Sequence, residues 1–430
     1  MSSTFQSLRV FNYRLWFLGA AVSNIGTWMQ RTAQDWIILT ELTDQDAAAV
    51  GISLALQFGP VLILTPMTGL VADLFDRRKI LLATQIAMGV LGLALAWLYL
   101  AGALELWMVY VLSGLLGVTT AFDGPARQAI VSELVTRDKM SNAIGLNSMS
   151  MTGARLVGPG VAGLLVAAIG AGWVFLINFV TFAATVAALL AMRQDELLEQ
   201  QRPTGKRPKM RDGVRYVLSR SDFTVVLLGT FVFSSIALNV SIYLATMTEV
   251  EFGADASEYG ILSSVVAIGS VAGSLLAARR EQPRVWMIGA GALAFGIIAM
   301  AAAFSPTIWV FGILIIGFGV STILSVNTAN AYIQVNTPLE IRGRVMAIYM
   351  ALVLGSNVFG GPLLGWVANV AGPRWAIVVG AVGGFVTAAM LLVWWLVTNR
   401  GRLSWSRQRP WRVTVSRLAP LTPNRTNRSS

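Results

Sequence analysis

The chain has 430 residues, of which 55% are apolar and only 12% are charged, and its mean hydropathy is +0.67. A soluble chain of this length would carry about a quarter charged residues. There is no cysteine or histidine, which excludes disulfides and thiol chemistry and removes the commonest metal ligand. The net charge of +11 belongs to no compact basic domain. We therefore expect contact with anionic membrane lipid and no binding of nucleic acid.

Twelve apolar stretches alternate with short polar breaks along the chain. Each is about 20 residues or longer, enough for a helix to cross a hydrocarbon core of about 30 Å. The sequence therefore predicts an all-α integral membrane protein. We place the spans near 15–40, 48–72, 79–101, 105–123, 141–167, 172–192, 223–248, 257–278, 285–303, 307–328, 344–368 and 374–397.

The basic residues fall almost entirely on every second break. Arg31 and Arg155 lie within spans and Arg374 alone lies on the opposite set of breaks, which leaves 29 of the 32 Lys and Arg residues on one side. Retained positive charge marks the cytoplasmic face. Because twelve is even, we expect both termini on that face.

The longest basic break, Arg193 to Asp222, divides the spans six and six. It predicts a cytoplasmic linker (193–222) between two bundles, 1–192 and 223–398. Met210 to Ser219 can form an amphipathic helix on the membrane surface. The tail 399–430 is rich in arginine and proline, and we expect it to be disordered.

The two halves repeat sequence features at a nearly fixed offset. Gly69 after span two corresponds to Gly273 after span eight, 204 residues later. Gly158-Pro159 in span five corresponds to Gly361-Pro362 in span eleven, 203 residues later. Two six-helix repeats with a substrate site between them near the midplane are a transporter architecture.

Three polar breaks carry motifs that resemble one family. They are Gly69-Leu-Val-Ala-Asp73-Leu-Phe-Asp76-Arg77-Arg78-Lys79, Phe122-Asp-Gly-Pro125-Ala-Arg127 and Thr337-Pro-Leu-Glu-Ile-Arg342-Gly-Arg344. The chain resembles the major facilitator superfamily over all twelve spans, in a bacterial branch similar to the enterobactin and macrolide exporters. The resemblance implies a multi-pass monomer in the cytoplasmic (inner) membrane, with two pseudo-symmetric bundles and no cofactor or metal.

The resemblance also implies residues that control opening and closing. Glycine at position 69 permits a close helix approach. The Asp73 carboxylate is expected to pair with basic loop residues and to face the start of helix eleven, stabilising its dipole. The charged network that would join the bundles while the cytoplasmic side is closed also includes Arg77, Arg78, Arg342 and Arg344. The alternative is that these arginines only set topology. Gly158 and Pro159 are expected to pack closely and bend span five.

Span one carries charged and amide side chains that a lipid-facing helix would not hold: Trp28 is followed by Gln30, Arg31, Gln34 and Asp35. Arg31 and Asp35 are four residues apart and can form an ion pair. Asp35 is the best candidate proton carrier. The pair could instead form an outer gate or be purely structural.

A second charged residue and several amides could also lie on the path. Arg155, four residues before Pro159, needs a carboxylate, a carbonyl or an anionic ligand, and a structural role is equally open. The remaining candidates are Asn178, Asn239, Tyr243, Asn327 and Asn357. Asparagines in membranes more often join helices by hydrogen bonds than bind ligands.

These features favour a secondary exporter of amphipathic, drug-like small molecules that works by alternating access and proton antiport. A dedicated siderophore or metabolite exporter is the alternative, and a lipid-modifying membrane enzyme is a remote one. No Walker-type phosphate loop occurs in the breaks, which argues against direct ATP hydrolysis. Many family antiporters carry an arginine within helix four, and span four here has none.

Overall fold

The structure is a computed structural model that describes residues 3–198, 210–278 and 282–398. The basic tail and residues 199–209 of the predicted linker lie outside the described residues. The N-terminal half contains η1 (Ser3–Arg9), α1 (Phe11–Thr40), α2 (Ala47–Leu74), α3 (Arg77–Leu100), α4 (Leu106–Leu134), α5 (Met140–Ile169), α6 (Ala171–Leu190) and η2 (Gln194–Glu196). The C-terminal half contains α7 (Met210–Ser219), α8 (Ser221–Ala237), α9 (Val240–Thr246), η3 (Met247–Glu251), α10 (Ala256–Ala278), α11 (Val285–Ala303), α12 (Ile308–Val335), α13 (Leu339–Ala371) and α14 (Pro373–Thr398).

The prediction of an all-helical membrane protein is confirmed. Among the described residues, 11 helices are long and apolar enough to cross a membrane, with Ser221–Glu251 taken as one of them. Helix α1 is not one of the 11, because its polar side chains lower its hydropathy. It is nevertheless 30 residues long, or about 45 Å, and packs along α5 and α6 inside the N-terminal half. Together with those 11, it makes twelve long helices among the described residues.

The predicted seventh span is not one continuous helix. It breaks between α8 and α9, where Asn239 has φ −87° and ψ 44°, and it ends in a π-helical turn, η3. The Asn239 amide donates to the carbonyl of Ser235 at 2.7 Å, and the Tyr243 hydroxyl donates to the carbonyl of Ile236 at 3.1 Å. These side chains satisfy carbonyls near the break, which is why it is stable in an apolar surrounding without proline or glycine.

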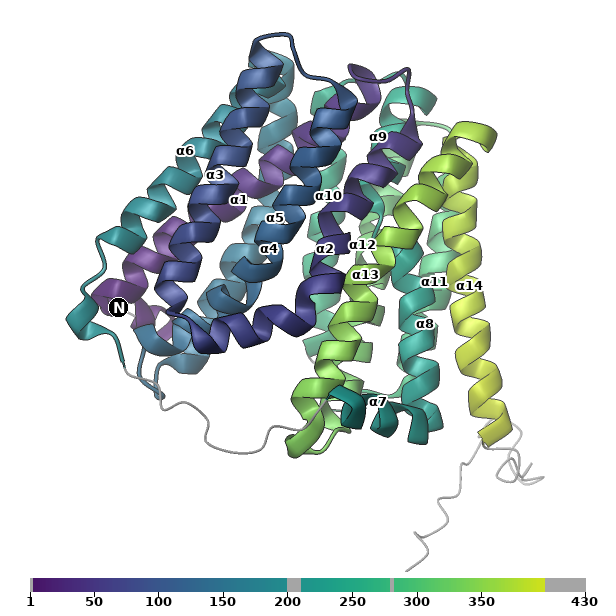
Figure 1. The fold of residues 1–430 in the computed structure, drawn as a ribbon. Coiled ribbons are helices and arrows are strands. Elements are labelled where there is room, and N and C mark those ends of the chain that lie inside the picture. The colour runs from purple at the N-terminus through teal and green to yellow at the C-terminus, as the bar shows by residue number, and fades with distance from the viewer. Residues whose placement is uncertain (1–2, 199–209, 279–281, 399–430) are drawn as a thin grey trace, which may run out of the picture.

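Several helices extend beyond their predicted ends on the side of the molecule that carries the basic breaks. Helix α4 continues to Leu134 and α12 to Val335, and α13 begins at Leu339. Hydropathy marks only the apolar part of a helix, so the polar turns at this end were missed. We call this side, at the bottom of Figure 1, the basic end, and the opposite side the acidic end.

The two halves meet along two helix pairs, α2 with α13 and α5 with α10 (Figure 1). Glycine permits the first approach, since a Cβ at Gly51 would collide with the carbonyl of Gly361. In the second pair, a Cβ at Gly163 would lie 2.8 Å from the Cα of Gly260. Because these positions lie in the acidic-end parts of their helices, the halves are in contact there.

The backbone repeats the pattern expected from the duplication. Gly170 joins α5 to α6 with φ +87°, and Gly372 joins α13 to α14 with φ +98°. Other residues rarely adopt this conformation. The two turns are 202 residues apart and therefore mark the same joint in each half.

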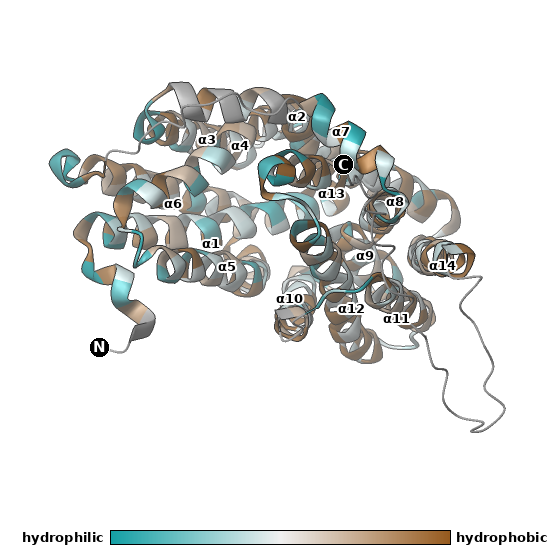
Figure 2. Cartoon of the chain, turned by 90° about the horizontal axis from the view of Figure 1, so that it is seen from below, coloured by the Kyte–Doolittle hydropathy of each residue, from teal (hydrophilic) through white to brown (hydrophobic). Residues whose placement is uncertain are grey.

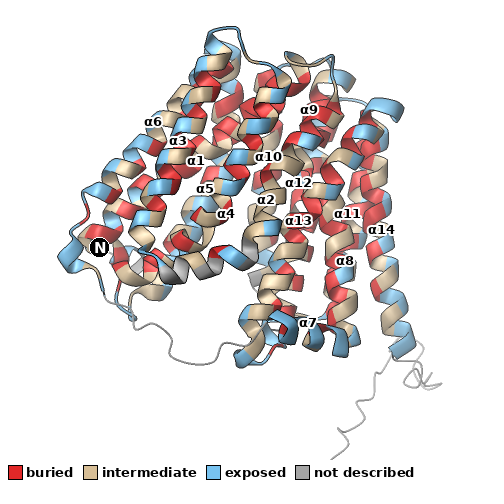
Figure 3. Cartoon of the chain, in the orientation of Figure 1, coloured by how far each residue is buried: buried red, intermediate tan, exposed pale blue. Residues whose placement is uncertain are grey.

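Apolar residues predominate along the helices (Figure 2), and buried residues gather where helices face one another (Figure 3). Trp97, Trp107 and Trp309 are exposed to 67%, 58% and 79%. Soluble proteins rarely leave so much apolar surface uncovered, so lipid is the natural surrounding of these faces.

Candidate functional site

The amides of α1 hold the N-terminal half together. The Asn178 amide donates to Gln30 Oε1 at 2.5 Å, and Gln34 Nε2 donates to the hydroxyls of Ser53 and Ser113 at 3.1 and 3.0 Å. Gln34 and Asn178 are 2% and 1% exposed. These three candidates therefore join α1 to α2, α4 and α6.

Arg31 and Asp35 of α1 do not form the expected ion pair, although their charges act on each other. The Arg31 guanidinium lies 5.3 Å from the ring centroid of Trp28 and 5.6 Å from that of Phe58. Its Nε has no hydrogen-bond partner, and neither has Asp35 Oδ1. A spacing of four residues brings two Cβ atoms together, but the Arg31 guanidinium lies beside the two aromatic rings.

Asp35 lies between the two halves. Its side chain is only 4% exposed, and its carboxylate interacts with Ser241 of α9 and with Tyr259 of α10. The next residue, Trp36, stacks on the ring of Tyr259 with centroids 5.4 Å apart. A movement that separates the halves at α1 and α10 would therefore change the surroundings of this carboxylate directly.

Arg155 of α5 lies against the same tryptophan as Arg31. Its guanidinium is 4.8 Å from the ring centroid of Trp28, and the residue is exposed. Glycine at position 158 makes this possible, because a Cβ there would lie 2.7 Å from the Cβ of Trp28. Next to it, the carbonyl of Pro159 faces Gly260 of α10. This part of α5 thus contacts both α1 and the opposite half.

The remaining candidates, three asparagines and a tyrosine, lie within the C-terminal half. Asn239 and Tyr243 hold the break described above. Asn327 donates to the hydroxyl of Ser274 at 3.3 Å and so joins α12 to α10. Asn357, 6% exposed, donates to the carbonyl of Leu354 in its own helix at 3.4 Å. The structure does not bring these residues together with Arg31 and Arg155.

In the described part of the chain, Arg77, Arg78 and Arg342 contact groups of their own half. Arg77 forms an ion pair with Glu133 at 2.8 Å, and Arg78 donates to the carbonyls of Leu189 and Leu190. Arg342 donates to the carbonyl of Thr337. The Cβ of Arg344 lies 2.9 Å from where a Cβ on Gly213 of α7 would be. Gly69 and Asp73 lie within α2, but the surroundings of Gly69 and the side chain of Asp73 are not among what the structure describes.

A link between the halves at the acidic end was not predicted. The Asn369 amide of α13 donates to Asp46 Oδ1 at 2.5 Å, and its oxygen accepts from the backbone N–H of Ala47 at 2.8 Å. Asp46 also caps the start of α2. The link borders a cavity of about 380 Å³ that Gln45 and Thr246 also line. The cap could have been read from the sequence, but its partner 323 residues away could not.

Two further clusters lie near the basic end. In the N-terminal half, the buried Asp123 pairs with Arg127 at 2.8 Å and accepts from Thr84 and Gln85. Both charged residues lie within α4. Because the sequence predicts that span four ends at Asp123, we did not expect these two residues to lie inside a helix.

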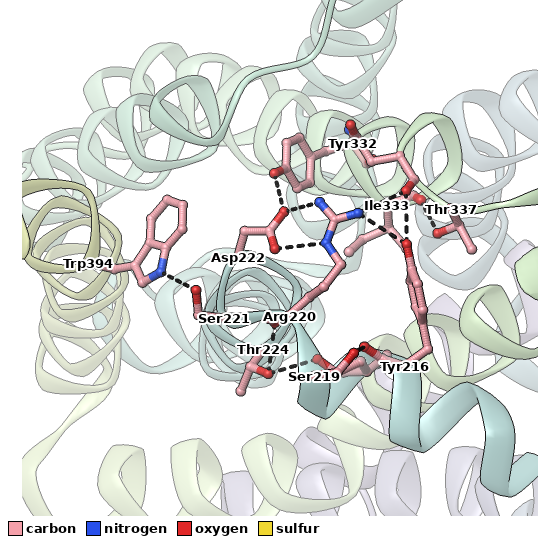
Figure 4. Close-up of polar contacts among 12 residues, drawn as sticks. Tyr216, Ser219, Arg220, Ser221, Asp222, Thr224, Tyr332, Ile333, Thr337 and Trp394 are labelled. Carbon is pink, nitrogen blue, oxygen red and sulfur yellow. Dashed lines mark hydrogen bonds and ion pairs between the residues drawn. The ribbon is translucent and has the colours of Figure 1, made fainter. Parts of the chain in front are cut away.

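In the C-terminal half, Arg220 binds Asp222, and the Tyr332 hydroxyl donates to the same carboxylate at 2.7 Å (Figure 4). The hydrogen bond to Asp222 raises the pKa of Arg220 above its usual range. This cluster joins α8 to α12, and Tyr216 of α7 also donates to a carbonyl at the end of α12.

Comparison with known proteins identifies the family. The transmembrane secretion effector family matches residues 2–412. The chain is 21% identical to the staphyloferrin A transporter of Staphylococcus aureus over 88% of its own length and 94% of that protein. It is 24% identical to the enterobactin exporter EntS of Shigella flexneri, covering 85% of this chain and 87% of that one.

Solved structures agree on the fold. A bacterial homolog of the human lysosomal transporter Spinster, in an inward-facing and unoccupied conformation, superposes with a TM-score of 0.71. The match covers 92% of this chain and 99% of that one at 16% identity. The chain therefore belongs to the transmembrane secretion effector family of the major facilitator superfamily, and it is a membrane transporter, not an enzyme.

Proposed function

We propose that this transporter exports amphipathic small molecules from the cytoplasm in exchange for protons. The basic end lies in the cytoplasm, as the distribution of Lys and Arg favours. The two halves rock about the α2–α13 and α5–α10 contacts and expose a central site to each side in turn. The state described above is the one closed at the acidic end.

The observation that carries this proposal is the position of Asp35 between the halves. A carboxylate buried as an anion without an ion pair costs several kcal/mol, and binding a proton removes that cost. Ser241 and Tyr259 belong to the opposite half, so rocking exchanges this burial for hydration. Protons reach Asp35 from outside while the acidic end is open, and the carboxyl is held neutral once the halves close over it. Exchange then requires that substrate binding on the cytoplasmic side displace this proton.

A dedicated siderophore or metabolite exporter is the second candidate. It is favoured by the relatives that match over most of the chain, whose names refer to staphyloferrin A and enterobactin. It uses the same alternating mechanism and differs only in the range of substrates.

A deletion strain tests both candidates. We expect it to become sensitive to several amphipathic drugs, and we expect a protonophore to remove the protection that the wild-type gene restores. Retention of one native metabolite without drug sensitivity would favour the dedicated exporter. If export persists when the proton gradient is collapsed, the proton-exchange proposal is wrong.

A further inference from the structure

We propose that Arg31, Trp28 and Arg155 form a binding subsite for an aromatic organic anion, such as a carboxylate or phenolate joined to a ring. This inference rests on the proposed export function and names the substrate class of that site. It comes from the placement of two guanidinium groups beside one indole, at 5.3 and 4.8 Å from its centroid.

No ion pair joins either arginine to an acidic residue in the described part of the chain. The described ion pairs do not include Arg31 or Arg155, and Arg31 Nε lacks a hydrogen-bond partner. Asp35, four residues after Arg31, acts on it through its charge, but this carboxylate also bonds to Ser241 of α9 and acts on Tyr259 of α10. Donors that no group of the protein satisfies remain available to a ligand.

Magnitudes indicate that the indole alone does not compensate these charges. A cation–π contact contributes about 0.5–2 kcal/mol, whereas one charge at the centre of a bilayer costs about 3 kcal/mol on insertion scales. Two cations beside one ring also repel each other. An anion bound between them would remove the repulsion and satisfy both guanidinium groups.

The same residues explain why the anion should carry a ring. Trp28 and Phe58 bring aromatic rings of α1 and α2 to Arg31. A planar guanidinium binds a carboxylate through two parallel hydrogen bonds and stacks on aromatic faces. A flat anion can therefore use charge and stacking together, and a cationic drug would meet two like charges.

Equilibrium dialysis of the purified full chain tests the subsite with three matched probes: naphthalene-2-carboxylate, its neutral carboxamide and naphthalen-2-ylmethylammonium. We expect the carboxylate to bind about tenfold or more tightly than the carboxamide, as a charged hydrogen bond allows, and the ammonium to bind least. Arg155→Gln and Arg31→Gln should each abolish this preference, while Arg155→Lys should keep part of it.

Arg14→Gln is the matched control. Arg14 also lies over an aromatic ring of α1, that of Phe11 at 5.6 Å, but near the start of the helix at the basic end. This variant should bind the probes like wild type. Equal affinity of wild type for the carboxylate and the carboxamide would overturn the proposal. So would an unchanged preference in Arg155→Gln, an exposed position where loss of folding is not expected.

Proton-driven export measured in proteoliposomes distinguishes failure of the subsite from failure of the proposed export function. If the anion preference depends on Arg155 but a proton gradient drives no export, the subsite stands and the exporter proposal fails. If export is proton-driven and Arg155→Gln keeps the wild-type preference for anions, the exporter stands and the subsite fails.

Discussion

The two halves share one helix arrangement but have different interiors. The N-terminal half is joined by polar contacts, with Gln34 bonded to two serines and Asp123 bonded to α3 and to Arg127. The C-terminal half is joined by aromatic packing. Phe295 lies 5.1 Å from Phe233 and 4.5 Å from Phe318, measured between ring centroids.

This difference shows what the duplication preserved. The glycine turns at Gly170 and Gly372 and the paired helix contacts repeat, because they determine the shape of each half. The ionisable groups do not repeat: Arg31, Asp35 and Arg155 all belong to the N-terminal half. We infer that this half carries the transport chemistry and that the other half supplies the surface against which Asp35 is buried.

Asp35→Asn should have the largest effect, and it tests whether the N-terminal half carries the transport chemistry. We expect proton-driven export in proteoliposomes to be lost completely, because an amide cannot carry the proton. Exchange of substrate without a gradient should continue, since the amide fits the same space. Glu41→Gln, at the end of the same helix, is the control and should leave both activities unchanged. Proton-driven export by Asp35→Asn at the wild-type rate would remove Asp35 from the mechanism.

Asp123→Asn tests the polar interior of the N-terminal half. The change leaves Arg127, only 13% exposed, without its ion pair, and breaking a buried pair costs about 3–5 kcal/mol. A clearly lower melting temperature in detergent is expected. Asp138→Asn, a change at a carboxylate exposed near the start of α5, should melt like wild type. Equal melting of both variants would show that this interior does not depend on its charges.

Gly51→Leu tests the seam at which the two halves meet. The new side chain would collide with the carbonyl of Gly361, and such overpacking costs about 1–3 kcal/mol, so the acidic end should open more often. The chain has no cysteine, so a single Ala368→Cys change, at a buried position that lines the acidic-end cavity, reports the opening through faster thiol labelling. Gly114→Leu is the control, because a Cβ there meets nothing within 4 Å. Equal labelling rates would contradict the seam.

Tyr332→Phe should have the smallest effect. It removes one hydrogen bond to Asp222 while Arg220 keeps its own, so we expect a loss of about 1–2 kcal/mol in the free energy of unfolding. Thermal melting in detergent measures it. In an Asp222→Asn background the same change should cost less. Equal losses in both backgrounds would show that the hydroxyl acts independently of this carboxylate.

Much of the molecule could be predicted from local sequence. The long apolar helices and the family follow from hydropathy windows and short motifs, which need no knowledge of distant residues. The break at Asn239 could not be predicted, because carbonyls there are satisfied by the side chains of Asn239 and Tyr243. The contact between Gln30 and Asn178 joins α1 to α6, which is the commoner role of such amides in membranes.

The sequence by itself determined that the chain is a duplicated helical membrane transporter, because the cost of exposing backbone and charge to lipid depends on each segment alone. Only the tertiary structure decided which side chains meet. Glycine at position 158 lets α5 reach Trp28 and place Arg155 beside it. Arg31 lies against the same ring, and the Asp35 carboxylate bonds to Ser241 of the opposite half. These contacts join residues far apart in the chain, so no local pattern could encode them.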